Sequence, residues 1–421
     1  MRLNIGLVLL LFGLVSCAED APVLERDLRN VSELDIEHGR YLASVGNCVS
    51  CHTSKEGPAL GGGVSFAVTG GLFDSPIGHI YSSNISPDSE TGIGAWTLGE
   101  FARALREGVS RDGRHLYPVF PYTHFSSLTD RDIFALFVFL RRSEPVRYEP
   151  PKNELPFPLN VRSMLALWKF FDGSGEPFEY DEWKSEAWNR GAYLVRGLAH
   201  CNACHGTRNA LGATADDSFN GAVMPSGWYA PSLRASREAG VREWSGNEVV
   251  ALLKDGVTAR ASVVGPMAEV VFRGTQYLSD ADAQAMAVYL HSLKERPVST
   301  VPARATIGED LRSLGGKVYE RHCADCHGKQ GEGVAGAFPA LAGNRAVTHT
   351  QPNNAIRIVL GGGYLPATAG NPRPHGMPPY GHLLKDAEIA TVLSYIRNAW
   401  GNTAPAVSAF EVQKQRGDAG R

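Results

Sequence analysis

Residues 48–52 read Cys-Val-Ser-Cys-His, and the same Cys-x-x-Cys-His pattern returns at residues 201–205 and at residues 323–327. The three copies contain six of the seven cysteines in the 421-residue chain. Three copies of this pattern in one chain are far more than would be expected by chance from its composition. The chemistry that requires two thiols and an adjacent imidazole therefore decides how the rest of the sequence is interpreted.

This spacing is the covalent attachment signal for c-type haem. Two thiols add to the two vinyl groups of one porphyrin, and the adjacent histidine reaches the iron from the same turn of chain. A thioredoxin-like Cys-x-x-Cys or paired zinc knuckles are the alternatives, and neither explains a histidine after every second cysteine. We therefore predict three covalently bound haem c groups, with the thioether pairs Cys48 and Cys51, Cys201 and Cys204, and Cys323 and Cys326, and with the iron ligands His52, His205 and His327.

The elements around each pattern also repeat. A helical segment with a glycine precedes it (from Gly39, Gly191 and Gly316), and an apolar helix follows some tens of residues later (from Thr129, Ser279 and Lys385). Thr129 with Asp132, and Ser279 with Asp282, have the spacing of a capping box, in which hydroxyl and carboxylate satisfy free amides at a helix start. The stretch from Trp96 aligns without gaps to the stretch from Trp244, so the first two repeats are the more similar pair.

This order of elements is that of a class I cytochrome c. We predict an all-α fold of three tandem class I cytochrome c domains with extensive loops, at residues 30–145, 181–295 and 305–402. A Pro-rich linker at residues 146–180 separates the first two domains, and Pro297 and Pro302 separate the second from the third. Residues 403–421 are polar and are expected to form a frayed tail.

Residues 1–17 contain a short basic start, an apolar run and a terminal cysteine. The run is too short to span a bilayer, so it predicts a lipoprotein signal peptide and lipobox with Cys17 as the lipidated residue. An ordinary signal peptide that contains a cysteine is the alternative. The lipobox places the mature chain in the periplasm of a Gram-negative bacterium, anchored to a membrane by lipid. Forty-one basic residues against 44 acidic ones, with no basic block, argue against a nucleic-acid partner.

Each haem needs a second axial ligand for electron transfer without substrate binding, and methionine is the usual one in cytochromes c. Met377 and Met267 lie just before closing helices and are the predicted ligands in domains three and two, with Met224 in reserve and Met286 expected to fill the core. Domain one has no methionine. His124 occupies the corresponding loop and is favoured over His79 and His115, with an imidazole near an open iron as the alternative.

The iron-bound imidazoles also need a hydrogen-bond acceptor that fixes their tautomer. In class I cytochromes a backbone carbonyl before a leucine commonly accepts this bond. Residues 339–341, 231–233 and 83–85 (Pro-Ala-Leu, Pro-Ser-Leu and Ser-Asn-Ile) are the corresponding positions here. A simple tight turn is the alternative interpretation of these three segments.

Three features together resemble a known family: the three Cys-x-x-Cys-His patterns, IYSSNISPDSETGIGAWTLGEF from Ile80, and GPMAEVV followed by TQYLSDADAQAMAVYL. The mature chain resembles the triheme cytochrome c subunits of bacterial periplasmic membrane-bound dehydrogenases. The resemblance implies a catalytic partner that is a molybdenum hydroxylase, a flavoprotein or a quinoprotein. It also implies delivery of electrons to ubiquinone or a terminal oxidase.

One position distinguishes the branches of that family. Subunits of alcohol and gluconate dehydrogenases carry a methionine where this chain has Phe120. The FPY-x-HF sequence is more similar to subunits paired with molybdenum hydroxylases. The expected function is electron transfer, with no catalytic residue in this chain. The alternatives are a peroxidase-like multihaem enzyme with an open iron in domain one, and a free-standing outer-membrane electron carrier.

Overall fold

The computed structural model describes residues 31–69, 76–172, 175–209, 212–214, 218–296 and 307–419. The predicted signal peptide, Cys17 and the joint at residues 297–302 lie outside the described residues. The described chain is helical, as expected, with two short antiparallel ribbons. In the first, β1 (Ser65–Thr69) pairs with β2 (Pro76–Tyr81), and in the second β3 (Ala222–Val223) pairs with β4 (Tyr229–Ala230).

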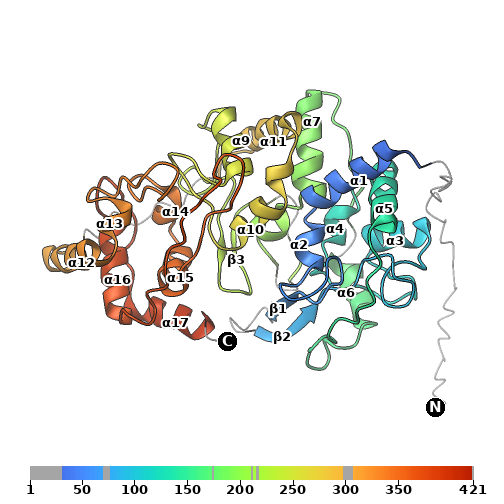
Figure 1. Ribbon diagram of the computed structural model, residues 1–421, viewed down its shortest axis with the longest axis horizontal. Coiled ribbons are helices and arrows are strands. Elements are labelled where there is room, and N and C mark those ends of the chain that lie inside the picture. The colour runs from blue at the N-terminus through green and yellow to red at the C-terminus, as the bar shows by residue number, and fades with distance from the viewer. Residues whose placement is uncertain are drawn as a thin grey trace, which may run out of the picture.

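Three long helix pairs organise the molecule, and each pair has the same relation to one Cys-x-x-Cys-His pattern. A helix that precedes the pattern packs against a helix that closes the repeat. The pairs are α1 (Glu33–Val45) with α5 (Asp130–Arg142), α7 (Glu186–Ala192) with α11 (Asp280–Ser292), and α12 (Glu309–His322) with α16 (Asp386–Ile396). We call each pair, with the chain between its helices, the first, second and third unit. Figure 1 shows the three units following one another along the longest axis.

Short helices fill the space inside each unit. The attachment patterns lie on α2 (Cys48–His52), α8 (Asn202–His205) and α13 (Ala324–His327). The chain enters α8 through a stretch of π-helix, η2 (Tyr193–Leu198). The remaining short elements are α4 (Tyr122–Phe125), α10 (Pro266–Arg273), η3 (Thr275–Tyr277) and α14 (Arg345–Thr348).

The aligned stretches from Trp96 and Trp244 form equivalent helices, α3 (Leu98–Glu107) and α9 (Gly246–Asp255). Each begins with a complete capping box, from Thr97 and Ser245, and each ends at a glycine in the left-handed conformation. In the third unit α15 (Asn353–Gly361) follows the attachment pattern in the same order. The repeat therefore extends from the sequence to the caps of the helices.

A glycine in each first helix lets the closing helix approach its backbone. A Cβ atom on Gly39 would lie 1.9 Å from the carbonyl oxygen of Ala135, and one on Gly191 would lie 2.0 Å from that of Ala285. In the third unit the equivalent residue is Gly315, where a Cβ would lie 2.5 Å from the Cβ atom of Tyr395. The next residue, Gly316, does not have this role, since the nearest atom to a Cβ there is 3.5 Å away.

The capping boxes expected at Thr129 and Ser279 are present only in part. Both hydroxyls accept the N3 amide, from Asp132 and Asp282. The two carboxylates do not return to the amides of Thr129 and Ser279, because tyrosine hydroxyls occupy that place. The predicted reciprocal half of each box is therefore wrong.

Two further helices lie in segments where none was expected. Residues 164–172 within the Pro-rich segment form α6 (Met164–Asp172), whose Lys169 donates hydrogen bonds to the carbonyls of Glu107 and Gly108 while Phe170 is 82% exposed. In place of a frayed tail, residues 409–419 form α17 (Ala409–Ala419), because Val412 is fully buried and Arg416 pairs with Asp386 at 2.7 Å. Among the described residues no helix is long and apolar enough to cross a membrane.

Gly191→Ala tests the glycine contact. The added methyl group would overlap the backbone of α11, so we expect the free energy of unfolding of the mature protein to fall by about 1–3 kcal/mol or more. Gly99→Ala is the control, because a Cβ there meets nothing within 4 Å, and it should raise stability by about 0.5–1 kcal/mol. Denaturant titration measures both. Equal effects of the two substitutions would contradict the contact.

Candidate haem-attachment sites

Each attachment pattern folds as a single helical turn, so its two thiols and its imidazole project from one short segment. None of the six cysteines of the patterns forms a disulfide. Burial, and then the second thiol of the same pattern, raise the pKa of Cys48, Cys201 and Cys323 to about 12. A thioredoxin-like site needs a lowered thiol pKa, so this environment does not fit that alternative. Among the residues that the structure describes, no three His, Cys, Asp or Glu side chains gather as they would around a metal ion.

The histidine of each pattern is held by a backbone carbonyl. The Nδ1 atom of His52 lies 2.7 Å from the carbonyl oxygen of Ser83. The Nδ1 atom of His205 lies 2.6 Å from the carbonyl oxygen of Pro231, and that of His327 lies 3.0 Å from the carbonyl oxygen of Pro339. A carbonyl can only accept, so Nδ1 carries the proton and the Nε2 lone pair stays available for a metal. Each of these carbonyls belongs to the first residue of one of the three segments that the sequence offered.

In the third unit the predicted methionine shares a cavity with the attachment pattern. Cys323, Cys326, His327 and Met377 all line one pocket. Two backbone hydrogen bonds to Gly363 hold Met377 on the loop before α16. The remaining walls are mainly apolar and aromatic, including Phe338, Ile358 and Tyr380. Two thiols, an imidazole and a thioether around an apolar cavity are the groups that a haem c needs, and the residues therefore fit it.

In the second unit Met267 lies on α10, which starts after Gly265. It packs against a small apolar cluster that includes Val263, Ala268 and Val271. Met224, the reserve candidate, is half-buried in a turn with Trp228. Met286 is 1% exposed inside the core, which confirms the expectation that it is a filler.

His124 lies on α4, and its hydrogen-bond partner comes from another unit. Its Nδ1 lies 3.0 Å from the carbonyl oxygen of Arg196, 72 residues along the chain. Burial, and then the nearby His200, lower the pKa of His124 to about 4, so the imidazole is neutral at pH 7. The Nδ1 bond to a carbonyl is the same one that the three pattern histidines make, and it likewise leaves Nε2 available.

The other two histidine candidates of the first unit have different surroundings. His79 lies on β2, with its Nδ1 3.0 Å from the Oγ atom of Ser65. The Nδ1 atom of His115 is buried and has no hydrogen-bond partner. Neither residue repeats the carbonyl contact of the pattern histidines.

Sequence reasoning missed two histidines close to these sites. His200 precedes the second pattern, and its ring lies edge-on to Phe125, with 5.4 Å between ring centroids. His349 is 6% exposed, and its Nδ1 has no hydrogen-bond partner. Burial lowers the pKa of His349 to about 4, with smaller contributions from Arg397, Arg345 and His205. No motif in the sequence singles out either residue.

The first and second patterns also lie close to each other. Burial, and then the thiol of Cys204, raise the pKa of Cys51 to about 11. A Cβ on Gly274 would lie 2.6 Å from the Oδ1 atom of Asn47, which begins α2, so the second unit reaches the first attachment helix. Figure 1 shows α10 beside α2.

Comparisons with known proteins agree with this chemistry. A family model described as cytochrome c matches residues 313–400. The cytochrome c subunit of alcohol dehydrogenase (quinone) from Gluconobacter oxydans is 36% identical over 98% of this chain and 86% of its own length. The fructose dehydrogenase cytochrome subunit of Gluconobacter japonicus is 36% identical over 90% of this chain and 82% of its own.

A third relative is larger. A nicotinate dehydrogenase subunit of Pseudomonas putida is 40% identical over 92% of this chain, which spans 32% of that relative's length. Identity of this level over most of the smaller relatives establishes common descent along nearly the whole chain. The chain belongs to the family of cytochrome c subunits of dehydrogenase complexes, which transfer electrons while a partner subunit performs the catalysis.

Proposed function

We propose that this protein is a triheme c-type cytochrome that carries electrons from a catalytic dehydrogenase subunit to ubiquinone or a terminal oxidase. One observation supports three haems: the Nδ1-to-carbonyl bond occurs at all three Cys-x-x-Cys-His patterns. A thioredoxin site gives no reason for that bond after every pattern. Zinc-bound histidines can make the same bond, but among the described residues no three His, Cys, Asp or Glu side chains gather as they would around a metal ion. Haem iron supplies one-electron redox chemistry, and the three units at residues 30–145, 181–295 and 305–402 are the proposed haem domains.

The chain's own residues set the properties of each haem. His52, His205 and His327 hold the irons, each fixed in one tautomer by its carbonyl. Met377 is the second ligand in the third unit, and its place beside His327 in one cavity supports this. Met267 is the proposed second ligand in the second unit, on sequence position. His124 is the proposed second ligand in the first unit, because its Nδ1 is bonded and its Nε2 is free.

The catalytic partner is proposed to be a molybdenum hydroxylase, with a flavoprotein or quinoprotein as the alternatives. Phe120 stands where the alcohol and gluconate branch has a methionine, and its ring packs 5.6 Å from that of Phe125 beside His124. A nicotinate dehydrogenase subunit among the relatives supports a partner that oxidises an N-heterocycle. The proposed location is the periplasm, with the lipid on Cys17 as the membrane anchor.

Haem stoichiometry tests the proposal directly. Intact-mass spectrometry of the exported, mature protein should give the mass of the chain plus three haems, because each pattern carries its own thioether pair. Cys323→Ser with Cys326→Ser is the matched variant and should give two. A wild-type mass with two haems or fewer would end the triheme assignment.

Met377→His and Met267→His test the thioether ligands. Each should lower the reduction potential of one haem, since methionine ligation raises it, within the roughly 0.8 V range that axial ligands span. Met286→Leu is the control, because that side chain fills the core and its replacement should shift no potential. Spectroelectrochemical titration measures the three potentials. Met224 becomes the candidate if Met267→His shifts nothing.

His124→Ala tests the histidine ligand of the first haem. It should leave that iron one ligand short, so that the reduced variant binds carbon monoxide while the wild type binds little. His79→Ala is the control and should behave as wild type, because His79 contacts Ser65 on the β1–β2 ribbon. Strong carbon monoxide binding by the wild type would instead favour the peroxidase-like alternative.

A further inference from the structure

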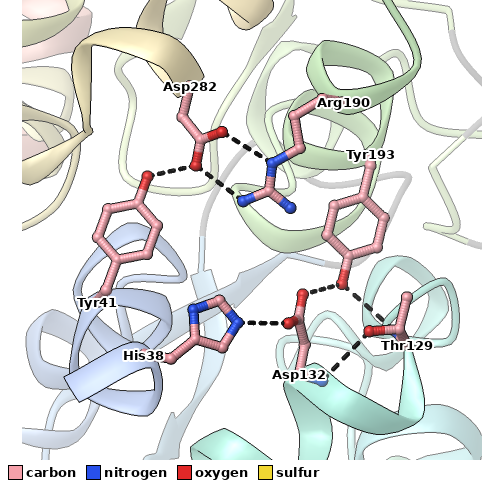
Figure 2. A network of polar contacts seen from close by, with 7 residues as sticks. All are labelled: His38, Tyr41, Thr129, Asp132, Arg190, Tyr193 and Asp282. Atoms are coloured by element: carbon pink, nitrogen blue, oxygen red, sulfur yellow. Dashed lines mark hydrogen bonds and ion pairs between the residues drawn. The ribbon is translucent and has the colours of Figure 1, made fainter. Parts of the chain in front are cut away.

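The first turns of α5 and α11 are completed by side chains from the other unit. At α5, the amide of Thr129 donates to the Oη atom of Tyr193 at 3.3 Å. The same hydroxyl donates to the Oδ2 atom of Asp132 at 2.5 Å. In a capping box the carboxylate would itself accept that amide. Here a tyrosine hydroxyl is inserted between the two groups, as Figure 2 shows.

The same arrangement occurs at α11 with the units exchanged. The amide of Ser279 donates to the Oη atom of Tyr41 at 3.4 Å, and that hydroxyl donates to the Oδ2 atom of Asp282 at 2.5 Å. Tyr41 belongs to the first unit and Asp282 to the second, whereas Tyr193 belongs to the second and Asp132 to the first. We call these two contacts the crossed tyrosine pair.

The crossed tyrosine pair is tied to the glycine contact of each unit. Tyr41 and Tyr193 each lie two residues after the glycine against which the closing helix packs. One residue before that glycine, His38 contacts the other oxygen of the Asp132 carboxylate, and Arg190 contacts both oxygens of the Asp282 carboxylate. His38 Nε2 lies 2.7 Å from Asp132 Oδ1, and Arg190 Nε and Nη2 each lie 2.8 Å from an oxygen of Asp282.

Both carboxylates are buried, at 5% exposure for Asp132 and 8% for Asp282. A buried carboxylate is stable only when its oxygens are hydrogen-bonded, and both oxygens of each are. Burial opposes ionisation of Asp282, but hydrogen bonds from Arg190 and Tyr41 outweigh it and lower the pKa of that carboxyl. Burial and the bond to Asp282 raise the pKa of Tyr41 to about 12. The Tyr41–Asp282 contact is therefore a charge-assisted bond between neutral tyrosine and carboxylate, a strong class of hydrogen bond.

The helices that carry these tyrosines lead straight into the attachment segments. A Cβ on Gly46, just before the first pattern, would lie 3.2 Å from Cδ1 of Leu198, just before the second. The third unit lacks the groups for this arrangement, because Lys317 occupies the tyrosine position and Glu388 itself accepts the amide of Lys385 at 2.9 Å.

We propose that the crossed tyrosine pair is a positioning device that fixes the first and second attachment segments against each other, so that their two haems influence one another. This rests on the proposed function for the presence of the haems. The two tyrosines and the two aspartates are not themselves iron ligands or haem-binding thiols. They act through α1 and η2, which lead into the two patterns.

The test compares the mature wild-type protein with Tyr41→Phe/Tyr193→Phe, which removes two hydroxyls and keeps both rings. Amide exchange in α1 and η2 should become about tenfold faster for each hydroxyl lost. The Soret circular dichroism couplet expected of adjacent haems should weaken, and the potentials of the first two haems should shift while that of the third stays. Tyr81→Phe is the matched control, because Tyr81 donates to Glu154 of the Pro-rich linker at 3.2 Å and touches no described carboxylate of the second unit, and it should change none of these readouts.

Each outcome decides the proposal. Faster exchange with an unchanged couplet and unchanged potentials would make the pair merely structural and overturn the positioning role. Unchanged exchange would overturn the contacts themselves. If the double variant does not mature, Tyr41→Phe alone leaves the Tyr193–Asp132 contact intact, and the same readouts at smaller amplitude are expected from it. A wild-type protein with fewer than three haems would contradict the proposed function, while amide exchange would still decide the crossed tyrosine pair.

Discussion

The absence of a side chain at one position of each first helix is the constraint on which the rest of the structure depends. At Gly39 and Gly191 a Cβ would fall within about 2 Å of a carbonyl oxygen of the closing helix, closer than any non-bonded contact allows. The closing helix can therefore approach the backbone of the first. This fixes where the first helix ends and the attachment pattern begins. It also brings the start of the closing helix beside the tyrosine of the other unit.

Much of this could be predicted from the sequence, because the signals involved are local. The attachment patterns, the helical periodicity of residues such as Ile389 and Leu393, and the hydroxyl caps depend on spacings of a few residues. The rest depended on tertiary contacts. The polar residues 409–419 form α17 because Val412 packs into the core of the third unit. At Thr129, the acceptor of the backbone amide is the hydroxyl of Tyr193, 64 residues away.

His124 shows the same limit at the candidate site. Its position before α5 could be read from the sequence, and so could the lack of a methionine in the first unit. The group that accepts its Nδ1 hydrogen is the carbonyl of Arg196 in the second unit. The position of His124 was therefore predictable from its own loop, but its tautomer was not, because the tautomer depends on another unit. The environment of His124 thus forms only when the first and second units come together.

The way the units join explains why the third differs in sequence. The contact between the first and second units uses the same patch of each, with tyrosine and aspartate exchanged, so it is an isologous contact within one chain. Such a contact is complete with two copies and leaves no patch for a third. The third unit meets the second elsewhere, where Arg345 lies 5.0 Å over the ring of Trp244 and donates to the carbonyl of Gly240. In the described part of the chain, no other unit meets the position two residues after Gly315. That position is solvent-exposed and is occupied by Lys317, a residue type that is common on exposed helix surfaces.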